Sequence, residues 1–195
     1  MMFLNCEWPA MTPLIIVLYL GSPPYKSLAL FRPEGSDMHK TIIPRLPLTG
    51  GCQCGAVRYS AQAHPLVFYL CHCSECQRQT SSAFGESLRF IRSAVEISGS
   101  LRCVRRKSSS GNIREGWFCP DCGVRIWHGT AGSAEINIKA GTLDDTSWLV
   151  PAGHIWTRSK QSFITIRTGE LDYPGQPSDG YAELKRRWNL MTLAE

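Results

Sequence analysis

The sequence lacks any run of 18 uninterrupted apolar residues, so it contains no predicted transmembrane helix. It also lacks internal repeats and the alternation of strands and helices that builds parallel βαβ sheets. Charged residues make up only 19% of the 195 positions, but the hydrophobic fraction of 43% is ordinary for a chain that buries a core, which excludes global disorder. The length suits one domain, or one domain with an appendage.

The first 37 residues differ from the rest of the chain. They hold a short apolar run at residues 14–20, but no Lys or Arg precedes it and no small-residue cleavage site follows it. This pattern disfavours a secretory signal and favours a cytoplasmic protein. Met38 begins a segment that would serve well as a start, and the net charge changes from −1 over residues 1–37 to +6 over residues 38–195. We interpret residues 1–37 as a poorly ordered or mis-assigned N-terminal extension.

Short runs of alternating or β-rich residues, separated by turn signals, recur along the chain. They lie at residues 56–60, 66–70, 83–90, 95–97, 101–104, 113–118, 124–127, 135–139, 154–157 and 163–167. Residues 181–190 are typical of a helix, which Ser178 and Asp179 would cap, and residues 74–79 favour one further helical turn. The sequence therefore predicts a mainly β fold of short antiparallel strands, in two sheets or a distorted barrel, with one C-terminal helix.

Positive charge is concentrated between Arg89 and Arg114, where seven basic residues face a single acidic one, Glu96. Such a segment can attract an anionic ligand or a nucleic-acid backbone, although its composition alone favours a solvated strand-and-loop face. It has no aromatic residues spaced for base stacking, and the chain contains no recognisable nucleic-acid module, which disfavours a nucleic-acid partner.

The cysteines are the most informative residues, because seven of the nine form three tight clusters: Cys52 and Cys54; Cys71, Cys73 and Cys76; Cys119 and Cys122. A C-x-x-C followed by Gly is typical of a zinc knuckle, and a C-x-C brings two thiolates to one metal from an extended turn. Soft thiolates at this density favour zinc, with an iron–sulfur cluster as the alternative. An odd total and strained spacings disfavour a disulfide framework. Cys6 and Cys103 stand alone and are interpreted as core residues.

The seven clustered thiols divide as four plus three. Four thiolates close a structural zinc site, whereas three leave one position open, which is the arrangement of a catalytic zinc. Spacing alone leaves the pairing of clusters open. Joining the first and third clusters is favoured, because each offers two sulfurs and the second offers three within six residues.

Several segments then resemble the glutathione-dependent formaldehyde-activating enzyme family, which also includes centromere protein V. The matching segments are residues 51–59, 71–78 with 82–84, 118–123, 141–145 and 154–160. The resemblance covers about residues 48–175, which it identifies as the zinc-binding domain, and leaves residues 176–195 as a C-terminal helical tail.

The resemblance implies an Mss4-like β fold with two zinc ions per chain. It implies a structural zinc held by Cys52, Cys54, Cys119 and Cys122, and a second, open zinc site formed by Cys71, Cys73 and Cys76. The family's name-giving reaction joins formaldehyde and glutathione into S-(hydroxymethyl)glutathione, and in reverse it is a carbon–sulfur lyase step. A small-molecule thiol such as glutathione is therefore the expected partner.

The roles of the neighbouring residues stay open at this point. His72 lies between two proposed ligands and could shuttle a proton as a catalytic residue, or could face away from the metal and hydrogen-bond the backbone. Asp144 and Asp145 could form a carboxylate pair or cap a turn. His154 and Trp156 could line a ligand cleft. The function itself has alternatives: a zinc-dependent enzyme acting on a thiol adduct, a non-catalytic zinc-stabilised binding module with a basic face for an anionic partner, or a thiol or metal sensor.

Overall fold

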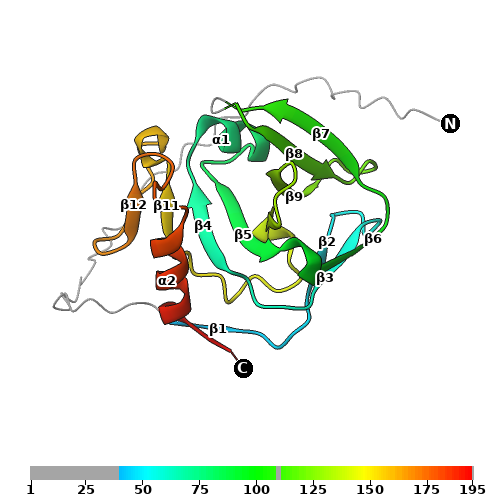
Figure 1. Ribbon diagram of the computed structural model, residues 1–195, viewed down its shortest axis with the longest axis horizontal. Coiled ribbons are helices and arrows are strands. Elements are labelled where there is room, and N and C mark those ends of the chain that lie inside the picture. Colours follow the sequence, from blue (N-terminus) through cyan, green and yellow to red (C-terminus); the bar gives the residue numbers. More distant parts are fainter. Residues whose placement is uncertain (1–39, 109–110, 195) are drawn as a thin grey trace, which may run out of the picture. The chain divides into compact units, whose positions relative to one another are not determined.

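The computed structural model describes residues 40–108 and 111–194, and the predicted extension at residues 1–37 lies outside the described residues. The described chain is mainly β, as predicted (Figure 1). Its strands are β1 (Thr41–Ile43), β2 (Leu48–Gly51), β3 (Arg58–Ala61), β4 (Val67–Cys71), β5 (Gly85–Ile91), β6 (Val95–Ser98), β7 (Arg102–Lys107), β8 (Ile113–Phe118), β9 (Arg125–Thr130), β10 (Glu135–Ile138), β11 (Gly153–Ile155), β12 (Leu171–Tyr173) and β13 (Thr192–Ala194). The α-helices are α1 (Ser74–Thr80) and α2 (Ala182–Met191).

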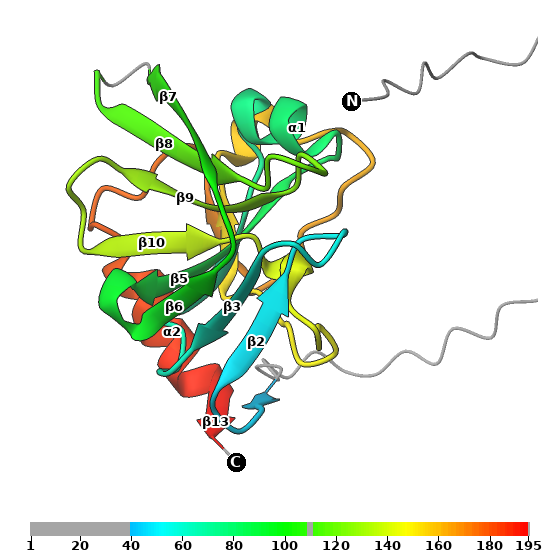
Figure 2. The ribbon, with the colours of Figure 1, turned by 90° about the vertical axis from the view of Figure 1, so that its right-hand side faces the viewer.

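Most of the strands form two sheets. One has eight strands in the order β12-β11-β4-β5-β10-β9-β8-β7, and the other has three in the order β2-β3-β6. Figure 2 shows the three-stranded sheet in front of the eight-stranded one. Side chains from both sheets, including Tyr59 of β3 and Phe90 of β5, meet in one hydrophobic core. The two sheets therefore form the layered β fold that the strand pattern predicts.

The prediction of antiparallel strands holds for most pairs, with exceptions around β11 and at the chain ends. β11 pairs in parallel with both β4 and β12, and β1 pairs in parallel with β13. A parallel pair needs a long connection rather than a tight turn. For β4 and β11, the connection is the long segment that includes β5 to β10. This segment forms other strands of both sheets before the chain returns to the free edge of β4 as β11.

One predicted strand is wrong. Residues 163–167 form turns and irregular chain instead, in which the Ile164 amide donates to the carbonyl of Gln161 at 3.1 Å. Phe163 is 71% exposed, so the alternating apolar pattern of this segment has no core to cover. The strand next to β11 is supplied a few residues later by β12.

The C-terminal helix α2 lies one residue from its predicted bounds and packs its apolar stripe on β4. Leu184, Trp188 and Met191 are buried, and the Trp188 ring meets Phe68 edge to face with centroids 6.4 Å apart. The predicted cap is present at Asp179, whose carboxylate accepts from the amides of Tyr181 and Glu183 at 3.0 and 2.9 Å. Within the described residues, no helix is both long and apolar enough to cross a membrane.

One face of the eight-stranded sheet carries polar side chains across four neighbouring strands. The strand register places Tyr69 opposite Ser87, Arg89 opposite Asn137, and Asn137 opposite His128. Paired residues project to the same side of a sheet, so these side chains share one face. We call this surface the polar face; Cys71, at the end of β4, projects on the same side as Tyr69 because the two are two residues apart.

Candidate metal centre

Two turns of similar geometry present the first and third cysteine pairs. In one, the Cys52 amide donates to the carbonyl of Val57 at 2.9 Å; in the other, the Cys119 amide donates to the carbonyl of Val124 at 2.9 Å. Gly55 and Gly123 follow the second cysteine of each pair with φ of 79° and 75°. Because this left-handed conformation favours glycine, both turns depend on the Gly that follows the cysteine pair.

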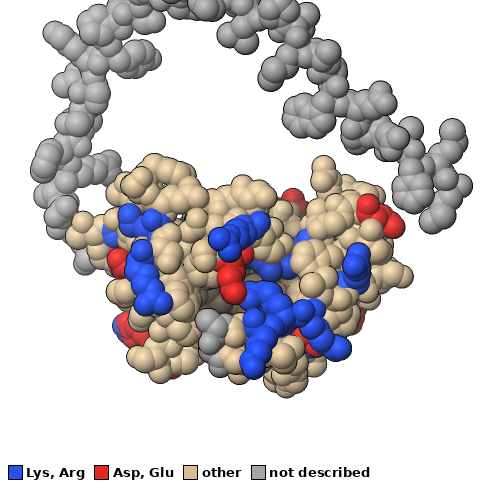
Figure 3. Space-filling view, turned by 90° about the horizontal axis from the view of Figure 1, so that it is seen from above, with Lys and Arg blue, Asp and Glu red and all other residues tan. Residues whose placement is uncertain are grey.

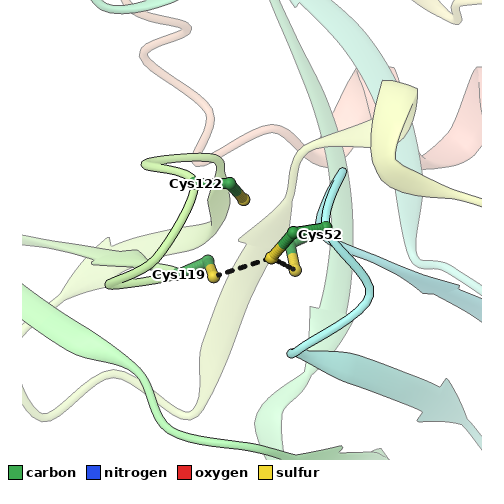
Figure 4. Close-up of side chains that lie close together, drawn as sticks. Cys52, Cys119 and Cys122 are labelled. Carbon is green, nitrogen blue, oxygen red and sulfur yellow. Dashed lines mark hydrogen bonds between the residues drawn. The ribbon is translucent and has the colours of Figure 1, made fainter. Parts of the chain in front are cut away.

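The two turns meet and form a cluster of four sulfurs, which we call the four-cysteine cluster: Cys52, Cys54, Cys119 and Cys122. Its sulfur atoms all lie within 4.8 Å of one another. The Cys52 and Cys54 sulfurs are 3.4 Å apart, and those of Cys54 and Cys119 are 3.7 Å apart. A tetrahedral ion with zinc–sulfur bonds of about 2.3 Å needs sulfurs about 3.8 Å apart, so this donor set fits zinc. Figure 4 shows Cys119 and Cys122 on one turn facing Cys52 on the other.

The four thiols of this cluster differ in their pKa values. The backbone amide of Val124 lowers the pKa of Cys122 to about 6. The amide of Ala56 lowers the pKa of Cys54, but the sulfurs of Cys52 and Cys122 outweigh it and raise that pKa to about 12. Burial acts to raise the pKa of Cys52, but the Val57 amide and the neighbouring thiols lower it overall. Ionisation of Cys54 is therefore the step that a bound cation would favour.

The second cysteine group forms a separate cluster, the three-cysteine cluster of Cys71, Cys73 and Cys76. Cys71 ends β4, Cys73 caps the N-terminus of α1, and Cys76 lies in the first turn of that helix. The Cys73 sulfur accepts from the Cys76 amide at 3.3 Å. The three sulfurs lie within 4.8 Å of one another. This set also fits zinc, and it leaves a fourth ligand position to a further group.

The sulfurs of the three-cysteine cluster are strongly coupled. The thiols of Cys71 and Cys76 lower the pKa of Cys73 to about 2. The same proximity, together with burial, raises the pKa of Cys71. The folded chain therefore favours a first thiolate here and opposes a second one, which is the behaviour of a site built around a cation.

Two basic side chains that the sequence analysis missed border this cluster. The point where a Cβ on Gly85 would stand is 3.2 Å from Nζ of Lys139 and 3.3 Å from Sγ of Cys76. Burial, and then the charge of Arg125, lower the pKa of Lys139 to about 8. Burial likewise lowers the pKa of Arg125 to about 10, although the cysteine thiolates raise it. A basic residue inside each apolar run, at 124–127 and at 135–139, was the signal available in the sequence.

The histidine predicted as catalytic is buried. His72 is 0% exposed, and its Nε2 lies 2.9 Å from Nδ1 of His154. Phe84 packs edge to face on its ring. Burial and the neighbouring charge of His154 lower the pKa of His72 to about 4. Because successive side chains of an extended segment alternate, the ring projects away from the side that Cys71 shares with the polar face. Its catalytic role stays a prediction.

The other predicted site residues have separate partners. The Asp144 carboxylate accepts from Arg58 at 2.9 Å and from the Thr49 hydroxyl at 2.7 Å. The Asp145 carboxylate accepts from the amide of Ser147 at 2.9 Å within its own turn. His154 is buried, with its Nε2 3.3 Å from a carboxylate oxygen of Glu170. Trp156 donates its indole N–H to Gln176 at 3.3 Å.

The basic segment is divided between two environments. On β7, Arg105 and Arg106 pair with Glu115 and Glu75 at 2.9 and 2.6 Å, which offsets part of their charge. Figure 3 shows basic side chains grouped on the side that carries α1 and β7, with acidic ones among them. Arg89, which pairs with Glu135 at 3.2 Å, and Arg114 line a cavity of about 170 Å³ on the polar face, together with Glu135 and Tyr181.

A family model and two known proteins are similar to this chain. The family model described as "Glutathione-dependent formaldehyde-activating enzyme" matches residues 47–159, which include both cysteine clusters. A Halomonas elongata protein named "Putative glutathione-dependent formaldehyde-activating enzyme" is 26% identical over 153 residues, which cover 73% of this chain and 97% of that protein. A crystal structure of a Rhodobacter sphaeroides protein is 18% identical, covers 65% of this chain and 99% of that chain, and has a TM-score of 0.40.

Proposed function

Since the chain belongs to the glutathione-dependent formaldehyde-activating enzyme family, we propose that it is a zinc-dependent enzyme of the carbon–sulfur lyase type. The substrate class is an adduct of a small-molecule thiol and an aldehyde, as in the condensation of glutathione with formaldehyde. The observation that carries this proposal is the division of the sulfurs into a set of four and a set of three. The larger set is complete, and the smaller one has room for a substrate atom.

The two clusters have different roles in this proposal. Cys52, Cys54, Cys119 and Cys122 hold a structural ion that joins the turn before β3 to the turn before β9. Cys71, Cys73 and Cys76 hold the second ion. Zinc bound there supplies an open ligand position that favours the ionised form of a thiol.

The chemistry needs no oxidant or reductant. The thiol sulfur forms a bond to the aldehyde carbon, and the thiol proton ends on the aldehyde oxygen; the reverse reaction breaks the same bond. An aldehyde reacts readily with a thiolate, so the chain contributes mainly by holding the reactants together. Arg114, in the cavity where Arg89 already pairs with Glu135, offers a basic group to a substrate that carries carboxylates, as glutathione does.

A reducing compartment such as the cytoplasm is part of the proposal. All eight described cysteines are free thiols, and seven of them belong to the two clusters. Oxidation would remove the ligands, so a compartment that keeps thiols reduced suits this protein.

The test combines metal content with a rate. Elemental analysis of the full chain, purified under reducing conditions, should give two zinc ions, one of which a mild chelator removes. Exchange spectroscopy should show glutathione and formaldehyde interconverting with their adduct faster than in buffer. Cys76→Ser should keep one zinc and its fold but lose this acceleration, whereas Cys103→Ser, outside both clusters, should behave as the wild type. An exchange rate equal to that in buffer for the two-zinc protein contradicts the proposal.

A further inference from the structure

A buried lysine without a partner stands beside the three-cysteine cluster. Lys139 is 7% exposed, and its Nζ has no hydrogen-bond partner among the described residues. The position of Gly85 brings this ammonium close to the Cys76 sulfur, because a Cβ at Gly85 would contact both. An unpaired buried ammonium is costly, so a fold that keeps one needs a compensating negative charge.

A second basic group lies in the same surroundings. The Nε and Nη2 atoms of Arg125 are buried and also lack hydrogen-bond partners among the described residues. Arg125 begins β9, and the Lys139 amide donates to the carbonyl of the next residue, Ile126, at 2.9 Å, so the two basic residues lie next to each other at the start of β9 and the end of β10. The two cations therefore lie together beside the three-cysteine cluster, which Lys139 approaches at Cys76.

The described carboxylates do not neutralise this pair. Glu86 acts on Lys139 more weakly than the cysteines do and forms no hydrogen bond with it. Its side chain instead lines a cavity with Leu70 and Phe84. In the strand register Glu86 pairs with Leu70, whereas Gly85 pairs with Cys71, so Glu86 projects from the opposite face.

The charge count then points to a missing anion. Three thiolates and a divalent ion together carry one negative charge, and the two basic side chains carry two positive charges. The group is therefore left with one positive charge in a buried position, and it becomes neutral when one more anion binds. A soft metal site bordered in this way favours sulfur as the donor.

We propose that Lys139 and Arg125 form a cationic subsite that selects the ionised sulfur of the substrate thiol at the open side of the three-cysteine cluster. This inference rests on the proposed function and extends it, because it assigns the recognition of the sulfur to two side chains. The subsite lowers the pH at which a thiol binds. The subsite contacts the sulfur itself, so it strengthens the binding of thiols with and without a carboxylate to the same extent.

Thiol binding, rather than turnover, provides the test. The full chain is loaded with Co²⁺, whose visible absorption responds to an added sulfur ligand, and is titrated with 2-mercaptoethanol and with 3-mercaptopropionate at several pH values. Lys139→Met should bind both thiols about tenfold more weakly and reach half-saturation at a higher pH, because a unit charge a few ångströms away is worth at least that factor. Lys139→Arg should restore binding, and Lys107→Met, at an exposed site on β7, should match the wild type.

Each other result has a definite meaning. Equal binding by Lys139→Met and the wild type overturns the inference, and so does weaker binding of 3-mercaptopropionate alone, because the subsite would then hold a carboxylate. Loss of the second metal from Lys139→Met also overturns it, since the lysine would serve only to balance the cysteines. If Lys139→Met does not fold, the same titration is made with Arg125→Met, which should also bind both thiols more weakly than the wild type. If the wild type binds neither thiol, the proposed function itself fails.

Discussion

Removing the outer half of the four-cysteine cluster should unfold the domain at a markedly lower temperature. The change is the double substitution Cys54→Ser and Cys122→Ser. Cys54 is exposed and Cys122 is half-buried, so two serines cost little in packing. What they remove is the metal-mediated link between two turns that come from opposite parts of the sequence.

The size of the effect follows from the length of chain that the link closes. Cys54 and Cys119 are 65 residues apart. Treated like a disulfide, a cross-link over such a loop contributes about 4 kcal/mol to the free energy of unfolding. This is a large part of the total for an ordinary domain, and it corresponds to a melting temperature lower by about 8–16 °C.

The assay is thermal unfolding followed by circular dichroism, with metal content measured on the same samples. Cys103→Ser is the matched control, because Cys103 is also a half-buried free thiol but lies outside both clusters. It should melt within about 2 °C of the wild type. If the double variant has lost one metal ion yet melts at the wild-type temperature, the four-cysteine cluster does not hold the fold together and the reasoning is refuted.

Three further outcomes are expected. Burial acts to raise the pKa of Glu135, but Lys185 and Arg89 outweigh it and lower the pKa below its ordinary 4.5. The resulting stability is present above pH 4.5 and is lost as the pH falls through the lowered pKa, so the difference in urea unfolding between wild type and Glu135→Gln should shrink progressively below pH 4.5. Trp188→Ala should cost about 3–5 kcal/mol of unfolding free energy by urea titration, because Trp188 is 1% exposed, whereas Leu190→Ala on the exposed side of α2 should cost under about 0.5 kcal/mol. Gly85→Ala should weaken thiol binding to the Co²⁺-loaded protein, because its methyl would stand 3.2 Å from Nζ of Lys139 and 3.3 Å from Sγ of Cys76.

The cysteine clusters could be predicted because their geometry is local. A pair of cysteines one or two residues apart, followed by glycine, closes a turn that depends on few other residues. Joining Cys52 and Cys54 to the pair at Cys119 and Cys122 required more, because a distant part of the chain had to be chosen. Counting sulfurs was enough for that choice, since the middle group could hold an ion alone.

The cationic subsite could not be predicted in this way. Lys139 follows β10 and Arg125 begins β9, and their approach to Cys76 depends on the register of β4, β5, β10 and β9. That register is a property of the whole sheet. In the sequence, Arg125 stands within one apolar run and Lys139 ends another, and a solvated strand residue is the ordinary interpretation of each.

The wrong strand at residues 163–167 has a similar physical origin. Alternation predicts a strand only when a sheet edge is available and one face can be buried. β12 occupies the position beside β11, so the earlier segment stays exposed. The pairing of β1 with β13 was equally inaccessible, because it joins the two ends of the described chain.

The two cysteine clusters are connected through the chain that lies between them. Arg125 is three residues beyond Cys122, directly after the turn that Gly123 completes. The turn holds the first residues of β9, where the Ile126 carbonyl accepts from the Lys139 amide at 2.9 Å. An ion in the four-cysteine cluster therefore does more than stabilise the fold. Under the proposed function, that ion would fix the start of β9 and with it the position of Arg125, so the four-cysteine cluster would also take part in recognising the substrate sulfur.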